Sequence, residues 1–380
     1  MGFRVLQVCN TDFYLEKFLL PMIIALRENG IEVECMTEVK TLPAVFARHD
    51  IKVHSLEFPA RASPIAFLTA IWRMYRFLRT NKFHLVNSHN RNSSIVARIA
   101  CALAGVPVNL YTAHGFYFQD HLSPVAYRLA ILFEGLLGRI TTHILSQSNE
   151  DRQYMTSTGR LSEDRITFIG NGVDTKRFSP VATPQPFRTS TRFRIGAMGR
   201  LVSGKGFEDI LRAMVCSAHT QDLELLFIGG NIAQDISPSA SVFDQLTSEL
   251  GLAENVRVTG MIDNVEDHLK TCDLFIHPSY AEGMPRSLLE AMSTGLPCIA
   301  TRIRGAREII LPEHNGLLYE PHDCDELAAH IDRLFNAAQT RKNLGEHARQ
   351  TVLERFREED YIARQVEVIR SLLNKHVLDE

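Results

Sequence analysis

The stretch HPSYAEGMPRSLLEAMSTGLP, residues 277–297, contains a strand end, a loop, a helix and a helix stop in one run. Pro285 suits the first turn of a helix, where its missing N–H is not needed, and Gly295 followed by Pro297 is typical of a helix end. The pattern therefore predicts a helix that begins at Pro285 and ends at Thr294. A buried strand that leads directly into a helix is the building unit of a parallel sheet.

The same alternation of short apolar runs with helix-period segments extends from this stretch to both ends of the chain. It predicts the α/β class, with mostly parallel sheets. The strands that we predict are 3–9, 32–37, 53–58, 85–88, 108–114, 143–148, 166–169, 193–198, 223–228, 256–259, 274–277, 298–300 and 316–319. We expect helices between them and a helical tail from residue 323 onward.

Residues 179–192 form a break between two such series of strands and helices. They lack periodicity and concentrate proline and hydroxyl side chains, which is the composition of a linker. We therefore predict an N-terminal domain over 1–183 and a C-terminal domain over 184–357, with a last helix at about 358–380 that packs back on the first domain. A chain of 380 residues, of which 45% are hydrophobic, can bury two cores of ordinary size.

The overall charge and the cysteines exclude several classes of protein. A formal net charge of -3 gives no general attraction to nucleic acid, so we expect no nucleic-acid partner. The seven cysteines stand singly, without the spacing of metal ligands, which fits a reducing compartment. The first residues are typical of a strand and not of a signal peptide, and no apolar stretch reaches roughly 18 residues. We expect a cytoplasmic protein.

The turn GRLVSGKG, residues 199–206, has the layout of a phosphate site. Its glycines let the backbone approach an anion, the start of the following helix supplies N–H groups, and Arg200 and Lys205 add two full charges. A diphosphate could be held there without a metal. The spacing matches neither a Walker loop nor the dinucleotide fingerprint, and a turn rich in glycine and lysine can also be no more than a turn.

Glu282 lies in the loop before the helix predicted over 285–294, and Glu290 lies inside that helix. Both carboxylates therefore border one pocket at the helix start, where the N–H groups from Met284 to Leu288 would point at an anion. Carboxylates accept hydrogen bonds from hydroxyl groups, so one suits a sugar ring and the other a ribose. A simpler interpretation is that Glu290 complements the helix dipole while Glu282 is a solvated loop residue.

Taken together, these segments resemble the retaining glycosyltransferases of family four, which have the two-domain GT-B fold. The resemblance rests on the run from Glu282 to Glu290, on Gly199-Arg200 and on Lys205-Gly206, and it spans nearly the whole chain. Weaker matches are Asn171-Gly172-Val173-Asp174 with Phe178, and Ala113-His114-Gly115. The resemblance implies two Rossmann-like domains whose parallel sheets face each other across a cleft that holds the active site.

The resemblance also implies roles for these residues. Arg200 and Lys205 would contact the donor diphosphate. Glu290 would bind the ribose, Glu282 would bind the transferred sugar, and His114 would reach that sugar from the first domain. The implied catalytic residues are His114, Glu282, Arg200 and Lys205. The implied donor-binding residues, which include the environment of the base, are Glu290, Gly283, Met284, Pro285, Arg286, Ser287, Leu288, Gly229, Gly230 and Met261.

Residues at the strand ends of the first domain are candidates for the acceptor side. His114 and His89 each follow a predicted strand, where a sheet delivers side chains into a crevice, although a histidine there is often structural. Many family members have a Gly-Gly turn after the first strand. This chain has Asn10 and Thr11 in that region, and we expect them to contact the acceptor instead.

The segment 64–79 combines apolar and aromatic residues with three arginines and no acid. It fits either an interfacial helix on an anionic bilayer or an ordinary crossover helix with its arginines in solvent. Residues 116–118, with the apolar segment 127–137, are a second candidate. Together they suggest a lipid-linked acceptor, for instance a polyprenyl-diphosphate sugar, and peripheral attachment to the inner face of the cytoplasmic membrane.

The sequence therefore predicts transfer of a hexose or N-acetylhexosamine from a nucleoside-diphosphate sugar, with UDP favoured. The acceptor would be a hydroxyl of a glycan or lipid-linked molecule in cell-surface polysaccharide synthesis. The resemblance implies retention of configuration, with the acceptor attacking the face that the diphosphate leaves. No cofactor and no metal is expected. Two alternatives stay open: a sugar-nucleotide epimerase on the same fold, and a catalytically silent sugar-nucleotide-binding protein.

Overall fold

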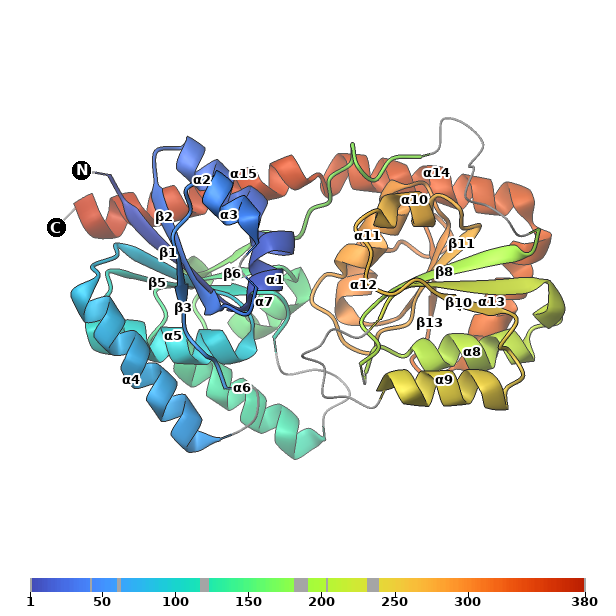
Figure 1. The fold of residues 1–380 in the computed structure, drawn as a ribbon, viewed down its shortest axis with the longest axis horizontal. Coiled ribbons are helices and arrows are strands. Elements are labelled where there is room, and N and C mark those ends of the chain that lie inside the picture. The colour runs from blue at the N-terminus through green and yellow to red at the C-terminus, as the bar shows by residue number, and fades with distance from the viewer. Residues whose placement is uncertain are drawn as a thin grey trace. The chain divides into compact units, whose positions relative to one another are not determined.

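The computed structural model describes residues 2–41, 43–59, 63–116, 123–180, 191–202, 204–230 and 239–378. The chain forms two compact units (Figure 1), of which the first contains Met1–Gly170 and Asp360–Glu380 and the second contains Asn171–Glu359. The first unit breaks off at Gly170, ahead of the boundary at 183 that the linker composition predicted. The reason is that Val173 and Phe178 pack into a core of the second unit.

The first unit is built on a sheet of seven parallel strands in the order β3-β2-β1-β4-β5-β6-β7. The strands are β1 (Arg4–Thr11), β2 (Glu32–Glu38), β3 (Val53–Ser55), β4 (Leu85–Ser88), β5 (Val108–Ala113), β6 (His143–Ser146) and β7 (Ile166–Phe168). The helical segments are α1 (Asp12–Tyr14), η1 (Leu15–Leu19), α2 (Leu20–Glu28), α3 (Ala44–Arg48), α4 (Pro64–Thr80), α5 (Arg91–Ala104), α6 (Pro124–Arg139), α7 (Asn149–Ser157), η2 (Glu163–Arg165), α15 (Glu358–Leu373) and η4 (Asn374–Leu378).

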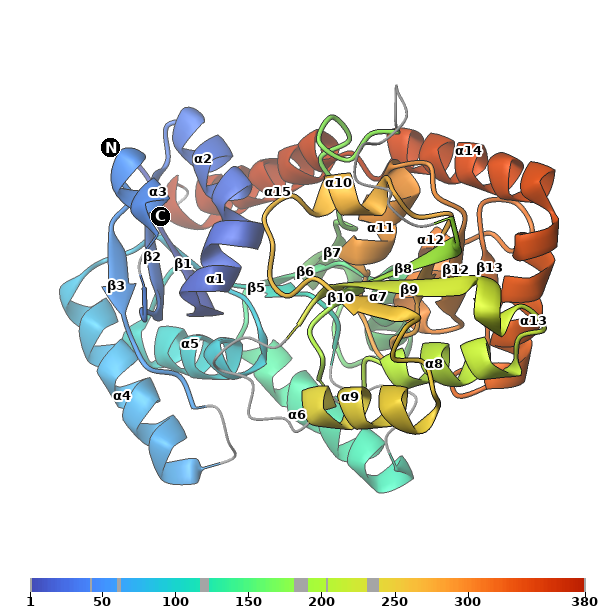
Figure 2. The same cartoon turned by 45° about the vertical axis from the view of Figure 1, so that its right-hand side comes forward.

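Helices cover both faces of this sheet (Figures 1 and 2). On one face α4 packs beside α5 and α5 beside α6, with Met74 of α4 buried against Leu6 of β1. On the other face Ile23 of α2 and Ile369 of α15 pack in one cluster with Val5 of β1. Val5 and Leu6 are consecutive residues of one strand, and consecutive side chains of a strand point to opposite faces of the sheet.

The second unit is built on six parallel strands in the order β10-β9-β8-β11-β12-β13. The strands are β8 (Phe193–Gly199), β9 (Leu223–Gly229), β10 (Val256–Val258), β11 (Leu274–His277), β12 (Cys298–Thr301) and β13 (Leu317–Tyr319). The helical segments are α8 (Phe207–Cys216), η3 (Thr220–Asp222), α9 (Ser239–Glu249), α10 (Val265–Leu269), α11 (Arg286–Ser293), α12 (Arg304–Ile309), α13 (Cys324–Asn336) and α14 (Ala338–Arg355). One core cluster joins the sheet to α8, α9 and α13, and another joins it to α11 and α14.

The strands predicted from the sequence are present in both units, most of them with ends that differ by one or two residues. The exception is β3, which was predicted over 53–58 and is paired with β2 only over Val53–Ser55. Leu56 and Phe58 are buried beneath α4, so their apolar character records burial in the core and not strand pairing. The helix predicted over 285–294 is α11.

Candidate active site

β8 and β11 are neighbours in the middle of the second sheet, and the chain leaves them in opposite directions. β8 leads to β9 and β10 on one side, whereas β11 leads to β12 and β13 on the other. Ligands of parallel sheets bind beyond the carboxyl ends of the strands at such a reversal. The segments that follow these two strands are the turn 200–206 and the loop 278–285, which are the two segments that the sequence singled out.

The turn and the loop contact each other directly. The backbone N–H of Tyr280 donates to the carbonyl oxygen of Gly204 over 3.0 Å. The Lys205 ammonium forms an ion pair with the Glu282 carboxylate, and both side chains are about three-quarters buried. Arg200 is exposed at the start of the same turn. The structure therefore brings Lys205 and Glu282 together on the second unit.

Gly206 allows this close approach. Its φ is +64°, and a Cβ at this position would lie 2.2 Å from the carbonyl oxygen of Pro278 and 2.8 Å from the Tyr280 ring, so a larger residue is excluded. The Tyr280 hydroxyl in turn donates to Asp209 in the first turn of α8 over 2.9 Å. The other carboxylate oxygen of Asp209 accepts the backbone N–H of His322 at 3.3 Å. Tyr280 thus ties the loop to the helix that follows the turn.

Glu282 carries a negative charge in this setting. Burial acts to raise its pKa, but the Lys205 ammonium acts against burial through its charge and its hydrogen bond, and the pKa lies below its ordinary value. His277, the last residue of β11, is 4% exposed, and burial lowers its pKa to about 4. The imidazole is therefore neutral at pH 7, while Lys205 and Glu282 form the charged pair.

The start of α11 offers backbone donors beside this pair. Pro285 is the N-cap and makes no side-chain capping hydrogen bond, so the first N–H groups of the helix are suited to an anion. Met284 and Leu288 are buried in the core of the second unit, whereas Arg286 and Ser287 at the same helix start are partly exposed. Asn171 Nδ2 donates to the carbonyl oxygen of Met284 over 3.0 Å, so this residue of the weaker motif holds the loop in place.

Two further predicted donor-binding residues lie at the same helix start. The carbonyl oxygen of Gly283 would be only 1.8 Å from a Cβ on Gly305, which shows that α12 packs closely against this loop. Ser287 Oγ lies 3.3 Å from Nδ1 of His277. His277 and Tyr280 were not among the predicted site residues. The one signal for His277 was its position at the end of a buried strand.

Glu290 lies in α11 and its side chain is 15% exposed. Burial raises the pKa of this carboxyl, although Arg286 acts in the opposite direction. The Arg286 guanidinium donates from Nε to Glu290 over 3.2 Å and from a terminal nitrogen to Glu358 over 2.8 Å. Arg286, which was predicted as a donor-binding residue, therefore orients the carboxylate that was predicted to bind the ribose.

Three strand ends meet next to the turn, where the base was predicted to lie. Gly199 pairs with Gly229 across β8 and β9, and Gly229 forms a further bridge to Gly260. A Cβ on Gly229 would lie 2.2 Å from the carbonyl oxygen of Gly199, and a Cβ on Gly230 would lie 3.7 Å from Cα of Gly260. Met261 is 49% exposed beside them. These glycines leave an edge of bare backbone that a flat ring can approach.

The first unit places its two candidate histidines in contact. His114 Nε2 is 3.0 Å from Nδ1 of His89, and His89 Nε2 is 2.9 Å from Oε1 of Gln7. His89 is fully buried, whereas His114 follows β5 and is partly exposed. Burial lowers the pKa of His89 well below its ordinary value and lowers the pKa of His114 to about 4, although a hydrogen bond with Gln147 acts against this in His114. Both rings are neutral at pH 7, and His89 orients His114.

Asn10 and Thr11 each accept a backbone N–H group. Asn10 Oδ1 accepts the N–H of Ser93, in the first turn of α5, at 3.0 Å. Thr11 Oγ1 accepts the N–H of Tyr14 at 3.2 Å and is the N-cap of α1. These side chains therefore shape the carboxyl edge of the first sheet by holding two helix starts. Their direct contact with an acceptor stays a prediction.

Metal-binding and membrane-spanning features were sought in the part of the chain that the structure describes. Within it, no group of three or more His, Cys, Asp or Glu side chains could hold a metal ion. None of the helices in these described segments combines the length and the apolar character that crossing a bilayer requires. Tyr117 and Phe118, part of the second membrane-contact candidate, lie outside the described residues.

Comparisons with known proteins agree with this architecture. A family model described as glycosyl transferases group 1 matches residues 183–351, and one described as Glycosyltransferase Family 4 matches residues 15–177. The lipopolysaccharide core biosynthesis glycosyltransferase LpsD of Rhizobium meliloti is 30% identical over 354 residues, 92% of each chain. The UDP-Gal:alpha-D-GlcNAc-diphosphoundecaprenol alpha-1,3-galactosyltransferase of Escherichia coli is 28% identical over 273 residues, 69% of each chain. The crystal structure of Anabaena HepE in complex with UDP and glucose has a TM-score of 0.81 at 20% identity and covers 97% of this chain and 100% of that chain.

Proposed function

The chain belongs to the group 1 glycosyltransferases with the GT-B fold, and on that basis we propose that it is a retaining enzyme that uses a nucleoside-diphosphate sugar. It transfers a hexose or N-acetylhexosamine to a hydroxyl of a glycan or lipid-linked acceptor in cell-surface polysaccharide synthesis. UDP is the favoured nucleotide. The protein works in the cytoplasm, peripherally on the inner face of the membrane, and without a metal or cofactor.

The observation that carries this proposal is the junction of the turn 200–206 with the loop 278–285. A departing nucleoside diphosphate develops negative charge, which preorganised cations and N–H groups stabilise. Lys205 supplies the cation, and the uncapped start of α11 supplies the N–H groups. Both lie at the strand reversal of the second sheet, where a diphosphate bound across them would be held from two sides.

The ion pair between Lys205 and Glu282 suits this chemistry. A diphosphate shares the Lys205 ammonium with Glu282, and Glu282 remains charged and accepts a hydroxyl of the transferred sugar. Retention follows when the acceptor oxygen attacks C1 on the face that the diphosphate leaves. The bond to the acceptor oxygen forms, the bond to the phosphate oxygen breaks, and the acceptor proton passes to that phosphate oxygen.

The names of similar proteins support the donor and the acceptor. The similar Escherichia coli enzyme is named for a UDP-sugar donor and a diphosphoundecaprenol-linked acceptor. The similar HepE structure holds UDP and glucose. We propose the same chemical classes for this chain: a UDP-sugar on the second unit, and a sugar on a polyprenyl diphosphate, or another glycan, as the acceptor on the side of His114.

Two measurements test the proposal. In a thermal-shift panel of UDP-, GDP- and ADP-sugars, we expect UDP-sugars to raise the Tm most, because a ligand at 100 times its Kd adds about 2.7 kcal/mol to the stability of the state that binds it. Incubation with a labelled UDP-sugar and acceptor should give an α-linked product from an α-linked donor, visible by NMR. No shift with any nucleotide sugar would remove the proposal. Conversion of the donor in the absence of acceptor would instead indicate an epimerase.

A further inference from the structure

The helices α4, α5 and α6 on one face of the first sheet expose an unusual amount of apolar surface. On α6 the exposed side chains follow one helix stripe: Val125, Leu129, Leu132, Phe133 and Leu136. On α4, Ile65 is 78% exposed, Leu68 is 67% exposed and Trp72 is 55% exposed. Leu103 of α5 is exposed between the two. Exposed apolar residues that gather on adjacent elements mark an interaction site, whereas single ones do not.

The charges on these three helices have one sign at the surface. α4 and α5 contain no Asp or Glu, and the single acid of α6, Glu134, is fully buried in an ion pair with Arg98 of α5. The exposed charged side chains of the three helices are all arginines: Arg73, Arg76, Arg79, Arg91, Arg128 and Arg139. Apolar side chains surrounded by cations and without exposed acids complement a surface that is apolar inside and anionic outside.

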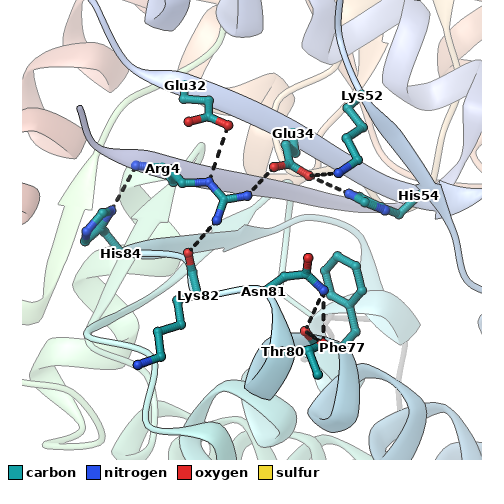
Figure 3. A network of polar contacts seen from close by, with 10 residues as sticks. All are labelled: Arg4, Glu32, Glu34, Lys52, His54, Phe77, Thr80, Asn81, Lys82 and His84. Carbon is teal, nitrogen blue, oxygen red and sulfur yellow. Dashed lines mark hydrogen bonds and ion pairs between the residues drawn. The ribbon is translucent and has the colours of Figure 1, made fainter. Parts of the chain in front are cut away.

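Acidic residues under and beside α4 offset only part of this charge. Glu34 of β2 is 5% exposed and forms ion pairs with Arg4 and Lys52 and a 2.5 Å contact with His54 (Figure 3). Burial acts to raise the pKa of Glu34, but His54 and Arg4 outweigh it, so the carboxylate stays charged and neutralised by its partners. Glu57, in the connection from β3 to α4, is an exposed acid that lines one pocket together with Arg73 of α4, whereas Arg76 and Arg79 do not line that pocket.

Trp72 and Arg76 form the kind of pair that a membrane interface favours. The Arg76 guanidinium lies 4.9 Å from the centre of the exposed Trp72 ring, one turn away on α4. An indole with an arginine on its face offers an apolar body to the acyl boundary and a cation to the lipid phosphates. The buried side of the same helix, Ala70, Met74 and Leu78, packs on the sheet. α4 is therefore a crossover helix that packs on the sheet with one side and exposes apolar and cationic residues on the other.

We propose that the outer face of α4, α5 and α6, defined by the exposed apolar residues and arginines above, docks on the surface of an anionic lipid bilayer. This rests on the proposed function, because it supplies the route to a lipid-linked acceptor. Each of the three helices begins after a strand of the first sheet ends, so the helix starts lie at the carboxyl edge. His114 lies at the same edge, directly after β5. Docking by this face brings an acceptor head group to the side of the first unit that carries His114.

Vesicle flotation of the full chain tests the proposal, with vesicles of phosphatidylglycerol and phosphatidylcholine compared with pure phosphatidylcholine. We expect flotation with the anionic vesicles at low salt and little with the neutral ones. Binding should fall as salt rises, because the Debye length shrinks from about 10 Å at 0.1 M to about 3 Å at 1 M. Absence of flotation with anionic vesicles at low salt would overturn the proposal.

Two pairs of variants locate the surface. Leu129→Glu with Leu136→Glu should reduce the bound fraction at least tenfold, whereas the matched pair Val215→Glu with Val242→Glu, exposed residues of α8 and α9, should leave it unchanged. Arg76→Gln with Arg79→Gln should lower the affinity about fivefold per arginine. The control pair is Lys176→Gln with Lys342→Gln, which removes the same charge from exposed sites of the second unit. It should leave the affinity for the vesicles unchanged. Equal loss in variants and controls would overturn the assignment of the surface.

The result can be separated from the donor chemistry. The UDP-sugar thermal shift of the same preparations needs no vesicle, and flotation needs no donor. A rise in Tm with a UDP-sugar, without flotation, would overturn the proposed membrane surface and leave the proposed enzyme function standing. Flotation without a rise in Tm would overturn the enzyme function and leave the membrane surface standing. A concentration-dependent dimer that the α6 variant dissociates, with no flotation, would assign this face to a second copy of the chain and also overturn the proposal.

Discussion

At the carboxyl edge of the second sheet, Lys205 and Glu282 form a charged pair, whereas at the same edge of the first sheet His114 and His89 form a neutral one. The difference lies in what surrounds each pair. Glu282 keeps its charge because the Lys205 ammonium, through its charge and its hydrogen bond, acts against burial, while burial dominates for both histidines. A charged edge beside a helix start without a side-chain cap suits a diphosphate. A neutral ring held by a second ring suits a hydroxyl, to which it offers a hydrogen bond without a charge.

The two edges are also held in different ways. The second unit brings its segments together through glycine, since at Gly206 a Cβ would meet the Pro278 carbonyl. The first unit holds its helix starts through side chains, with Asn10 and Thr11 accepting backbone N–H groups. In the proposed function, these few residues at the strand ends make one sheet the donor side and the other the acceptor side. Each prediction below changes one of these features.

Removal of the cation should have the largest effect. We expect Lys205→Ala to lower kcat by about 100-fold, in the range found when one donor to a developing negative charge is removed. The loss includes the repulsion between the diphosphate and a Glu282 carboxylate that no longer has its partner. Steady-state kinetics with a UDP-sugar measure it. Lys342→Ala, an exposed lysine of α14, is the control, and an unchanged kcat in Lys205→Ala would contradict the comparison.

Adding a side chain at Gly206 should have the next largest effect. In Gly206→Ala the added Cβ meets the carbonyl of Pro278, so the turn and the loop must separate. We expect the free energy of unfolding to fall by about 2 to 3 kcal/mol and UDP affinity to fall by about 30-fold. Chemical denaturation and calorimetry measure the two quantities.

Gly251→Ala is the matched control for Gly206→Ala. Its φ is +69°, close to that of Gly206, but no atom lies within 4 Å of the added Cβ. It shares the backbone strain of about 1 kcal/mol and lacks the collision. UDP affinity should therefore stay unchanged in Gly251→Ala. Equal loss of UDP affinity in both variants would show that strain, and not contact between the segments, explains the result.

The parts of this comparison that the sequence could predict are those that depend on local pattern. Apolar runs and glycine or proline punctuation predicted the parallel strands and the helix α11, and the position of each motif directly after a strand predicted that both lie at strand ends. The ion pair between Lys205 and Glu282 was not predicted. The early end of β3 was not predicted, because apolar residues occur both in paired strands and in buried segments that pair with no strand.

Other features depend on three-dimensional partners. The neutral state of His277 results from burial, which no local pattern around that residue records. The contact of His89 with Gln7 joins residues that are 82 positions apart and follows from the pairing of β1 with β4. The end of the first unit at Gly170 follows from Val173 packing in the second, whereas linker composition marked only the later residues. Register and packing decide these features, and a single sequence does not display either.

The ribose contact should have a smaller effect than the two changes above. Glu290→Ala removes a carboxylate that Arg286 orients, and we expect UDP affinity to fall about tenfold, as for the loss of a hydrogen bond to a charged group. The same substitution should leave the affinity for a 2′,3′-dideoxy analogue of UDP unchanged, because that analogue lacks the hydroxyls. If both ligands lose affinity equally, Glu290 acts by holding α11 and not by binding the ribose.

The neutral edge of the first sheet predicts a pH effect, the smallest of the series. His114 has a pKa of about 4 in the folded protein, below its ordinary value of 6.5, so between these values the unfolded chain binds more protons. Stability is therefore fully present above pH 6.5 and falls as the pH falls toward 4. His114→Asn should flatten this dependence by at most about 1.4 kcal/mol per pH unit. His49→Asn, at an exposed histidine, is the control in denaturation series at several pH values. A slope in His114→Asn equal to that of the unmodified protein would mean that the ring is charged in the folded state, and the two edges would then not differ in the way that their burial indicates.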